Sequence, residues 1–179
     1  MACISKLANA IAYDCDSGAT GLVSALIINK ADIASFTVDA AGTVSALTLA
    51  AGAKAYKIDT VKRSLVMSTA LKVNDGAPNA FTHTATLTDM TRPTSGVHFN
   101  ISSAMANGSF VIIYRPVGGT QAVVNGLYYG MAATAFDKSS HDNGAWTTIT
   151  LETPENVIGE DNLSMSTSVY AALYTAAVG

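Results

Sequence analysis

The stretch SLVMSTALKV-NDGAPN-AFTHTATLTDM, which runs from Ser64 to Met90, carries the clearest structural signal in the chain. On both sides of its centre apolar residues alternate with small polar ones, and a period of two is the period of a β-strand. The six central residues, Asn74 to Asn79, combine asparagine, aspartate, glycine and proline, which are the usual turn formers. We therefore expect the two longest strands here, 64–73 and 80–90, joined as a hairpin by a protruding loop.

The two faces of the second strand differ in chemistry. We expect one face to pack on a core, and it carries Phe81, His83, Ala85 and Leu87. The corresponding face of the first strand carries Leu65, Met67, Leu71 and Val73. The other face is small and polar, and it carries Thr82, Thr84, Thr86 and Thr88. Two interpretations of the threonines are open: an ordinary solvated sheet face, because threonine favours strand geometry, or a hydroxyl-lined wall such as the inside of a tube.

The rest of the chain also favours strands over helices. Two largely apolar runs, Leu22–Asn29 and 109–115, predict buried strands. Further extended segments are expected at 35–39, 44–49, 127–136 and 145–152. One helix is expected within 94–107, between Pro93 and the Asn107-Gly108 pair. These elements predict a mainly β fold, a β-sandwich or barrel with one flanking helix and one long hairpin.

The composition indicates an unusually neutral surface. Alanine, threonine and serine occupy 66 of the 179 positions, and only 13% of the residues are charged. Such a surface suits a subunit covered by copies of itself better than a lone monomer. The net charge of −3 argues against a nucleic-acid grip, which needs a dense lysine and arginine face. Basic residues cluster in 54–72, and five acidic residues follow Lys138. This uneven distribution of charge suits head-to-tail contacts between identical subunits. It is equally explained by chance clustering on a solvated face.

No catalytic, cofactor-binding or metal-binding constellation is predicted. The adjacent residues Ser140, His141 and Asp142 cannot converge as nucleophile, base and orienting acid from a single loop. Cys3 and Cys15 lie in no metal-ligand spacing, and we expect them to be reduced thiols. No apolar stretch approaches the roughly 20 residues of a membrane-spanning helix. We expect a protein that is made in a cytoplasm and does not enter a membrane.

A series of short motifs resembles the tail tube proteins of bacteriophages. In order along the chain they are Met1-Ala2-Cys3, Asp14-Cys15, the strand 21–30, Phe110-Val111-Ile112-Ile113, the Gly118-Gly119 turn, Val124-Asn125-Gly126-Leu127-Tyr128, Asp142-Asn143-Gly144 and the strand from Trp146 to Glu152. Each motif is short, so the resemblance rests on their order. It implies one tail-tube-like domain over 1–179, with an N-terminal arm at 1–20. The final segment, 163–179, is apolar and small and has no obvious solvated face, so we expect it to dock on this subunit or on a neighbour.

The resemblance also implies a role and partners. The chain would form a homo-oligomeric ring, six-fold or a multiple of six, through which DNA passes without specific binding, in the tail of a virion assembled in the bacterial cytoplasm. Its neighbours would be other tail or portal-proximal proteins. On this interpretation the threonines line the lumen, and the ring-stacking loop is Asn74, Asp75, Gly76, Ala77, Pro78 and Asn79.

Other classes of protein stay open at this stage. The final segment, Leu163 to Gly179, is longer and more apolar than a plain tube subunit requires. This difference keeps open an alternative interpretation, a ring or adaptor subunit in the head-to-tail region of a short-tailed phage of the crAss-like kind. A pilin-like or adhesin-like β subunit would share the composition but should carry an export signal. A small enzyme would need a convergent polar pocket, which nothing in the sequence predicts.

Overall fold

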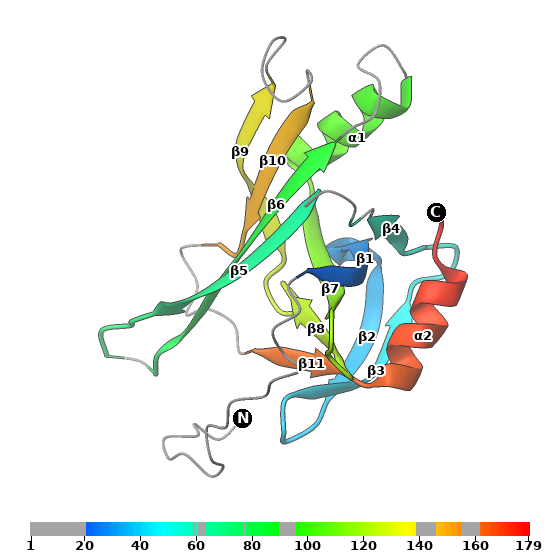
Figure 1. The fold of residues 1–179 in the computed structure, drawn as a ribbon. Helices are drawn as coiled ribbons and strands as arrows, with labels where there is room; N and C mark the ends of the chain where they lie inside the picture. The colour runs from blue at the N-terminus through cyan, green and yellow to red at the C-terminus, as the bar shows by residue number, and fades with distance from the viewer. Residues whose placement is uncertain are drawn as a thin grey trace.

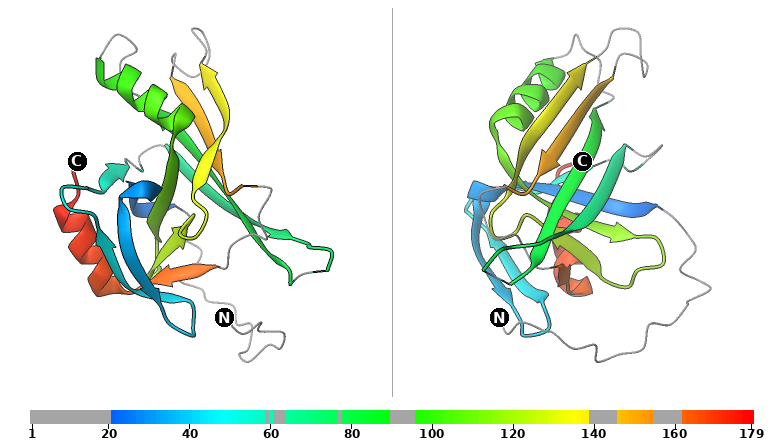
Figure 2. Two further views of the ribbon diagram at one scale, coloured as in Figure 1. Left: turned by 180° about the vertical axis from the view of Figure 1, so that it is seen from behind. Right: turned by 90° about the vertical axis from the view of Figure 1, so that its left-hand side faces the viewer.

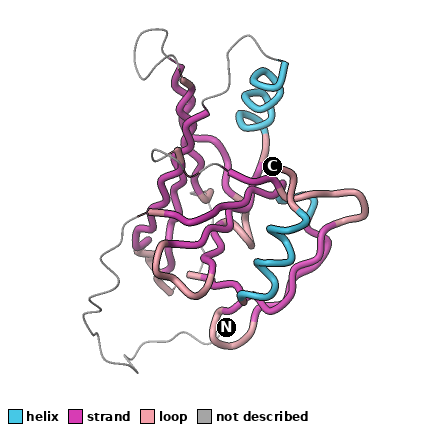
Figure 3. The backbone as a smooth tube through the Cα atoms, turned by 45° about the vertical axis from the view of Figure 1, so that its right-hand side comes forward, coloured by secondary structure: helices cyan, strands magenta, loops and turns pink. Residues whose placement is uncertain are grey.

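The computed structural model describes residues 21–58, 60, 64–76, 78–89, 96–138, 146–154 and 162–179. The N-terminal arm expected at 1–20, with both cysteines, and the Ser140-His141-Asp142 loop lie outside these residues. Within them the fold is mainly β, as predicted (Figures 1 and 3). The strands are β1 (Leu22–Asn29), β2 (Ile33–Val38), β3 (Thr43–Leu49), β4 (Tyr56–Ile58), β5 (Leu65–Lys72), β6 (Ala80–Asp89), β7 (Ser109–Pro116), β8 (Ala122–Asn125), β9 (Met131–Lys138), β10 (Thr147–Glu152) and β11 (Leu163–Met165).

All these strands belong to one curled, mixed sheet. Its main path runs β2-β3-β11-β8-β7-β9-β10-β6-β5, and β1 pairs with β7 and with β4 off this path. The β1–β7 pairing is antiparallel and long, from Leu22 opposite Pro116 to Asn29 opposite Phe110. The two apolar runs that predicted buried strands are therefore neighbours at the centre of the fold, although they lie far apart in the sequence.

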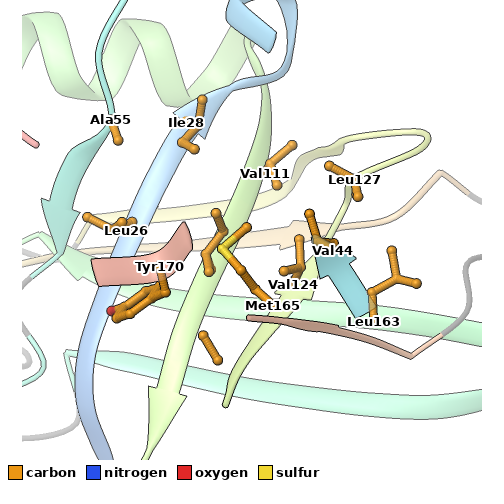
Figure 4. Close-up of a cluster of buried hydrophobic side chains, with 12 residues drawn as sticks. Leu26, Ile28, Val44, Ala55, Val111, Val124, Leu127, Leu163, Met165 and Tyr170 are labelled. Carbon is orange, nitrogen blue, oxygen red and sulfur yellow. The ribbon is translucent and has the colours of Figure 1, made fainter. Parts of the chain in front are cut away.

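Strands β1 and β7 are buried on both faces, which explains why their apolar runs are continuous rather than alternating. On one face, Leu26, Ile28, Val111 and Ile113 enter a core that β3, β8, β11 and Tyr170 complete (Figure 4). On the other face, Ala25, Ile27, Phe110 and Ile112 enter a second core, closed by apolar residues of β5, β6, β9 and β10. The molecule is thus layered, with one core on each side of the β1–β7 pair.

The long hairpin is confirmed. Strands β5 and β6 pair antiparallel from Leu65 opposite Leu87 to Lys72 opposite Ala80. Its distal half extends beyond both cores and projects from the body of the molecule (Figures 1 and 2). We call this projecting part, residues 70–82 as far as they are described, the hairpin arm.

Two helices are present in the described residues, where the sequence predicted one. The expected helix is α1 (Gly96–Asn107), which packs beside β9. The second, α2 (Thr167–Ala176), follows β11 in the segment expected to dock. Strand β11 inserts between β3 and β8, parallel to the former and antiparallel to the latter. The segment 163–179 therefore docks on its own subunit.

The extended segment expected at 127–136 is wrong in its first part. Strand β8 ends at Asn125, a turn follows, and β9 begins only at Met131. Gly126 and Gly130 have φ of +80° and +76°, a left-handed conformation that glycine adopts without strain. The turn folds Leu127 into the first core, where its side chain is fully buried. Leu127 is therefore buried in a turn and not in an extended strand.

Candidate functional site: the threonine face and the hairpin arm

The alternation predicted for β6 is present in the structure. His83, Ala85 and Leu87 are buried, and the four threonines, Thr82, Thr84, Thr86 and Thr88, are half-buried on the opposite face of the strand. The buried face of β6 is tied to the body of the molecule by polar bonds. The Thr69 hydroxyl lies 3.0 Å from His83 Nδ1, and the His83 backbone N–H donates to Thr153 Oγ1 over 3.1 Å. These bonds fix the orientation of β6 where the hairpin joins the body of the molecule, and so they fix the direction in which its threonines point.

The strands beside β6 extend its threonine face into a small polar surface. In register, Thr86 lies between Val66 of β5 and Thr150 of β10, and Thr88 lies beside Thr148. Cross-strand pairs share a face of the sheet. We call the whole surface the threonine face, and its members on β5, β6, β10 and β9 are Val66, Ser68, Ala70, Thr82, Thr84, Thr86, Thr88, Thr148, Thr150 and Ala135.

Three charged side chains share the threonine face among the described residues. Asp137 pairs with Thr148 near one end, and Glu152 lies directly opposite Thr84, whose hydroxyl donates to Glu152 Oε1 over 3.3 Å. Lys72 continues the same face at the far end of β5, on the hairpin arm. The other positions of the face present hydroxyl and methyl groups, which carry no charge to attract phosphate.

The candidate stacking loop lies at the tip of the hairpin arm. The Asn74 side chain donates to the Pro78 carbonyl over 2.9 Å, and the Asn74 backbone N–H donates to Asn79 Oδ1 over 3.2 Å. Gly76 has a φ of +79°, and Asp75, Gly76, Pro78 and Asn79 are exposed. Ala77 lies outside the described residues. The loop is thus an ordered, internally bonded tip held well away from the cores.

The hairpin arm exposes apolar side chains that the sequence pattern placed on a core face. Leu71 is 61% exposed and Val73 is 70% exposed, whereas Leu65 on the same face of β5 is 4% exposed. The alternation continues along the strand, but the second core ends before Leu71. Sequence reasoning missed this exposure, because a period of two indicates which face a residue occupies and not how far the covering layer extends.

A second exposed region lies around β4 and the end of the chain, and sequence reasoning missed it as well. Backbone bonds of 2.8 Å from Lys57 N–H to the Val178 carbonyl and of 3.0 Å from Val178 N–H to the Ala55 carbonyl hold the final residues against β4. Beside them is an open depression of about 380 Å³, lined by Val23, Ser24, Lys57, Ile58, Thr60, Tyr174 and Gly179. We call it the C-terminal depression.

The described residues hold no group of three or more histidine, cysteine or acidic side chains placed to bind a metal ion. Burial raises the pKa of Tyr114 and also that of Tyr170, whose hydroxyl shares a 2.7 Å hydrogen bond with Ser24. Both tyrosines are therefore neutral packing groups at ordinary pH. In the part of the chain that the structure describes, neither helix has the length and apolar character that crossing a membrane requires.

Comparison with known proteins adds no relative. No protein-family model matches the chain, and no curated protein and no solved structure matches it. The surfaces of the molecule and the order of the sequence motifs are therefore the only indications of its role.

Proposed function

We propose that this chain is a structural subunit that assembles with copies of itself into a ring or tube of a bacteriophage tail, with the threonine face lining the channel. The observation that carries the proposal is the uncharged character of most of that face, which spans β5, β6, β10 and β9 and carries two carboxylates and one lysine in the described residues. The phage assignment itself rests on the order of the sequence motifs.

The chemistry of the face suits a conduit for DNA. A wall of lysine and arginine would hold phosphates by releasing counterions and would slow the passing duplex. Hydroxyl and methyl groups offer no charge to the phosphates, and the carboxylates of Asp137 and Glu152 repel them, while Lys72 adds one base to the face on the hairpin arm. The proposed channel therefore passes DNA without specific binding.

Three features support self-assembly. Among the described residues β5 and β2 are the two ends of the main sheet path, and an end strand is where a further strand can pair. Few residues of the chain are charged, so covering its surface with another subunit removes few charged groups from water and has a small desolvation penalty. The hairpin arm exposes Leu71 and Val73, and a contiguous exposed apolar patch usually marks an interface. Repeated contacts between unlike surfaces of identical subunits close into rings or extend into filaments.

We further propose the setting that the tail-tube interpretation carries with it. The ring has six-fold symmetry or a multiple of it, its neighbours are other tail or portal-proximal proteins, and it is part of a virion assembled in the host cytoplasm. A ring or adaptor subunit of a short-tailed phage would use the same face. The apolar final segment was the reason for considering an adaptor. It packs into its own subunit through β11 and α2, so its apolar character does not require another virion protein to cover it.

The proposal is tested by the mass and shape of the purified protein. Native mass spectrometry and light scattering over a concentration series should give an integer multiple of the subunit mass, and negative-stain images should show rings or short tubes with a central hole. A monodisperse 18.4 kDa species at high concentration and moderate salt would contradict the proposal. So would compact oligomers without a central hole.

A further inference from the structure

Two apolar patches account for most of the exposed large apolar side chains in the described residues. Of nine such side chains, Leu71 and Val73 lie on the hairpin arm, and Val23, Tyr56 and Val178 lie around the C-terminal depression. The patches lie on opposite sides of the molecule, with the arm at the left of Figure 1 and α2, β4 and the chain end at the right. The 180° view in Figure 2 shows the same separation.

Two side-chain contacts hold together the elements that surround the C-terminal depression. The Ser24–Tyr170 hydrogen bond joins β1 to α2, and the Lys57 ammonium lies 5.0 Å from the centre of the Tyr174 ring. The depression is open to solvent, and Val23, Ile58 and Tyr174 are the lining residues that offer apolar surface to an inserted side chain.

We infer that the hairpin arm of one subunit docks into the C-terminal depression of a second copy, with Leu71 and Val73 as the apolar anchors. This inference rests on the proposed self-assembly and names the two surfaces that meet. Apolar anchors that fill a pocket supply most of the binding energy in protein interfaces.

The arrangement of the patches favours a second copy as the occupant. The arm points away from the depression of its own subunit, so one chain cannot join the two. The arm carries the exposed Asp75 at its tip, with Lys72 further back along β5, and the exposed Lys57 lines the depression, so Asp75 and Lys57 can meet as unlike charges in the proposed contact. A symmetric contact of arm against arm would instead bring Asp75 close to its own copy. The favoured contact is therefore head-to-tail, which generates a closed ring or a filament.

Disulfide trapping tests the contact directly. In a background with Cys3→Ser and Cys15→Ser, single variants Val73→Cys and Val178→Cys are prepared, one of them with a mass tag. Mild oxidation of the equimolar mixture should give the mixed dimer as the main product, while each variant alone gives little dimer. The matched control is Val66→Cys, an exposed valine on the same strand but outside the arm, which should not link to Val178→Cys. The double variant Val73→Cys/Val178→Cys should give a ladder of covalent oligomers.

A second measurement uses no cross-link. Leu71→Asp and Val73→Asp change exposed side chains, so the thermal unfolding temperature of the unassembled subunit should change little. The concentration at half-assembly should rise about thirty-fold for either variant, the shift expected when one hot-spot contact is lost. The control Val66→Asp should shift it much less.

The outcomes separate this inference from the proposed function. An assembled protein that forms no mixed dimer, that forms mainly arm-to-arm dimers, or that assembles normally with aspartate at position 71 or 73 overturns the docking and leaves the ring intact. A protein that stays monomeric at every concentration overturns both.

Discussion

Placing positive charge on the threonine face should turn a passive wall into a DNA-binding one. We choose Thr82→Lys with Thr86→Lys, because neither threonine has a carboxylate directly opposite it in register. Four residues along a strand span about 13 Å, which exceeds the Debye length of about 8 Å at physiological ionic strength. The two new ammonium groups therefore repel each other little. Because both positions are half-buried and face outward, the free energy of unfolding should change by no more than about 0.5 kcal/mol.

The size of the expected effect follows from counterion release. Each phosphate contact on duplex DNA adds a slope of about 0.9 to the dependence of affinity on salt. A rise from about 50 to 200 mM salt therefore lowers the affinity about 3.5-fold per contact, and about twelve-fold where one subunit makes two contacts. The wild-type assembly should show no measurable salt-sensitive binding.

Fluorescence anisotropy with a short linear duplex, read across the salt series, measures the effect. The matched control is Thr37→Lys with Thr48→Lys, two exposed threonines on β2 and β3 that lie outside the threonine face. A covalently closed DNA circle cannot thread a closed ring, so it should compete poorly. If the control pair gains the same binding, or if the circle competes as well as the linear duplex, the threonine face does not line a channel.

Three further predictions concern the fold and the loop. Gly130→Ala should lower the free energy of unfolding by about 1–3 kcal/mol, because φ at this position is +76° and the added methyl would meet the Ser109 hydroxyl; chemical denaturation measures it, and adding Ser109→Ala should recover only part of the loss. Burial raises the pKa values of Tyr114 and Tyr170, so the neutral phenols contribute stability below about pH 10, which is the pKa of an unfolded tyrosine. This contribution is lost as the pH rises further. The thermal unfolding temperature should therefore fall more steeply above pH 10 in the wild type than in Tyr170→Phe, and equal slopes would refute this. Shortening 74–79 to a two-residue Asn-Gly turn should keep the subunit folded, since hairpins accept that connection, and should reduce tubes to single rings in electron micrographs; unchanged tubes would show that the loop is only solvated.

How far the sequence predicts this structure is clearest along β5. Leu65 and Leu71 occupy the same face of one alternating strand, and the pattern predicts a core position for both. Only Leu65 is covered, because the second core is built by strands β9 and β10 and by the β1–β7 pair. Where that layer ends depends on pairings between distant segments, and alternation within one strand carries no information about them.

Helix α2 shows a different limit. An amphipathic helix is recognised by polar residues that recur on its exposed face. Here the exposed positions are alanine, serine and threonine, and the chain uses the same three residues in its strands, so the period is hidden. The common face of Thr82, Thr84, Thr86 and Thr88 was predictable because these four residues lie within one strand. The C-terminal depression was not, because its residues come from β1, β4 and α2 and meet only in the folded chain.

The insertion of β11 between β3 and β8 has a consequence for the timing of synthesis. Ser164 pairs with Thr43 across 121 positions of sequence, so the facing edges of β3 and β8 stay apart until β11 has left the ribosome. Folding that depends on such distant pairing is slow. The first core, whose members include Leu163 and Met165, cannot close before β11 has been made.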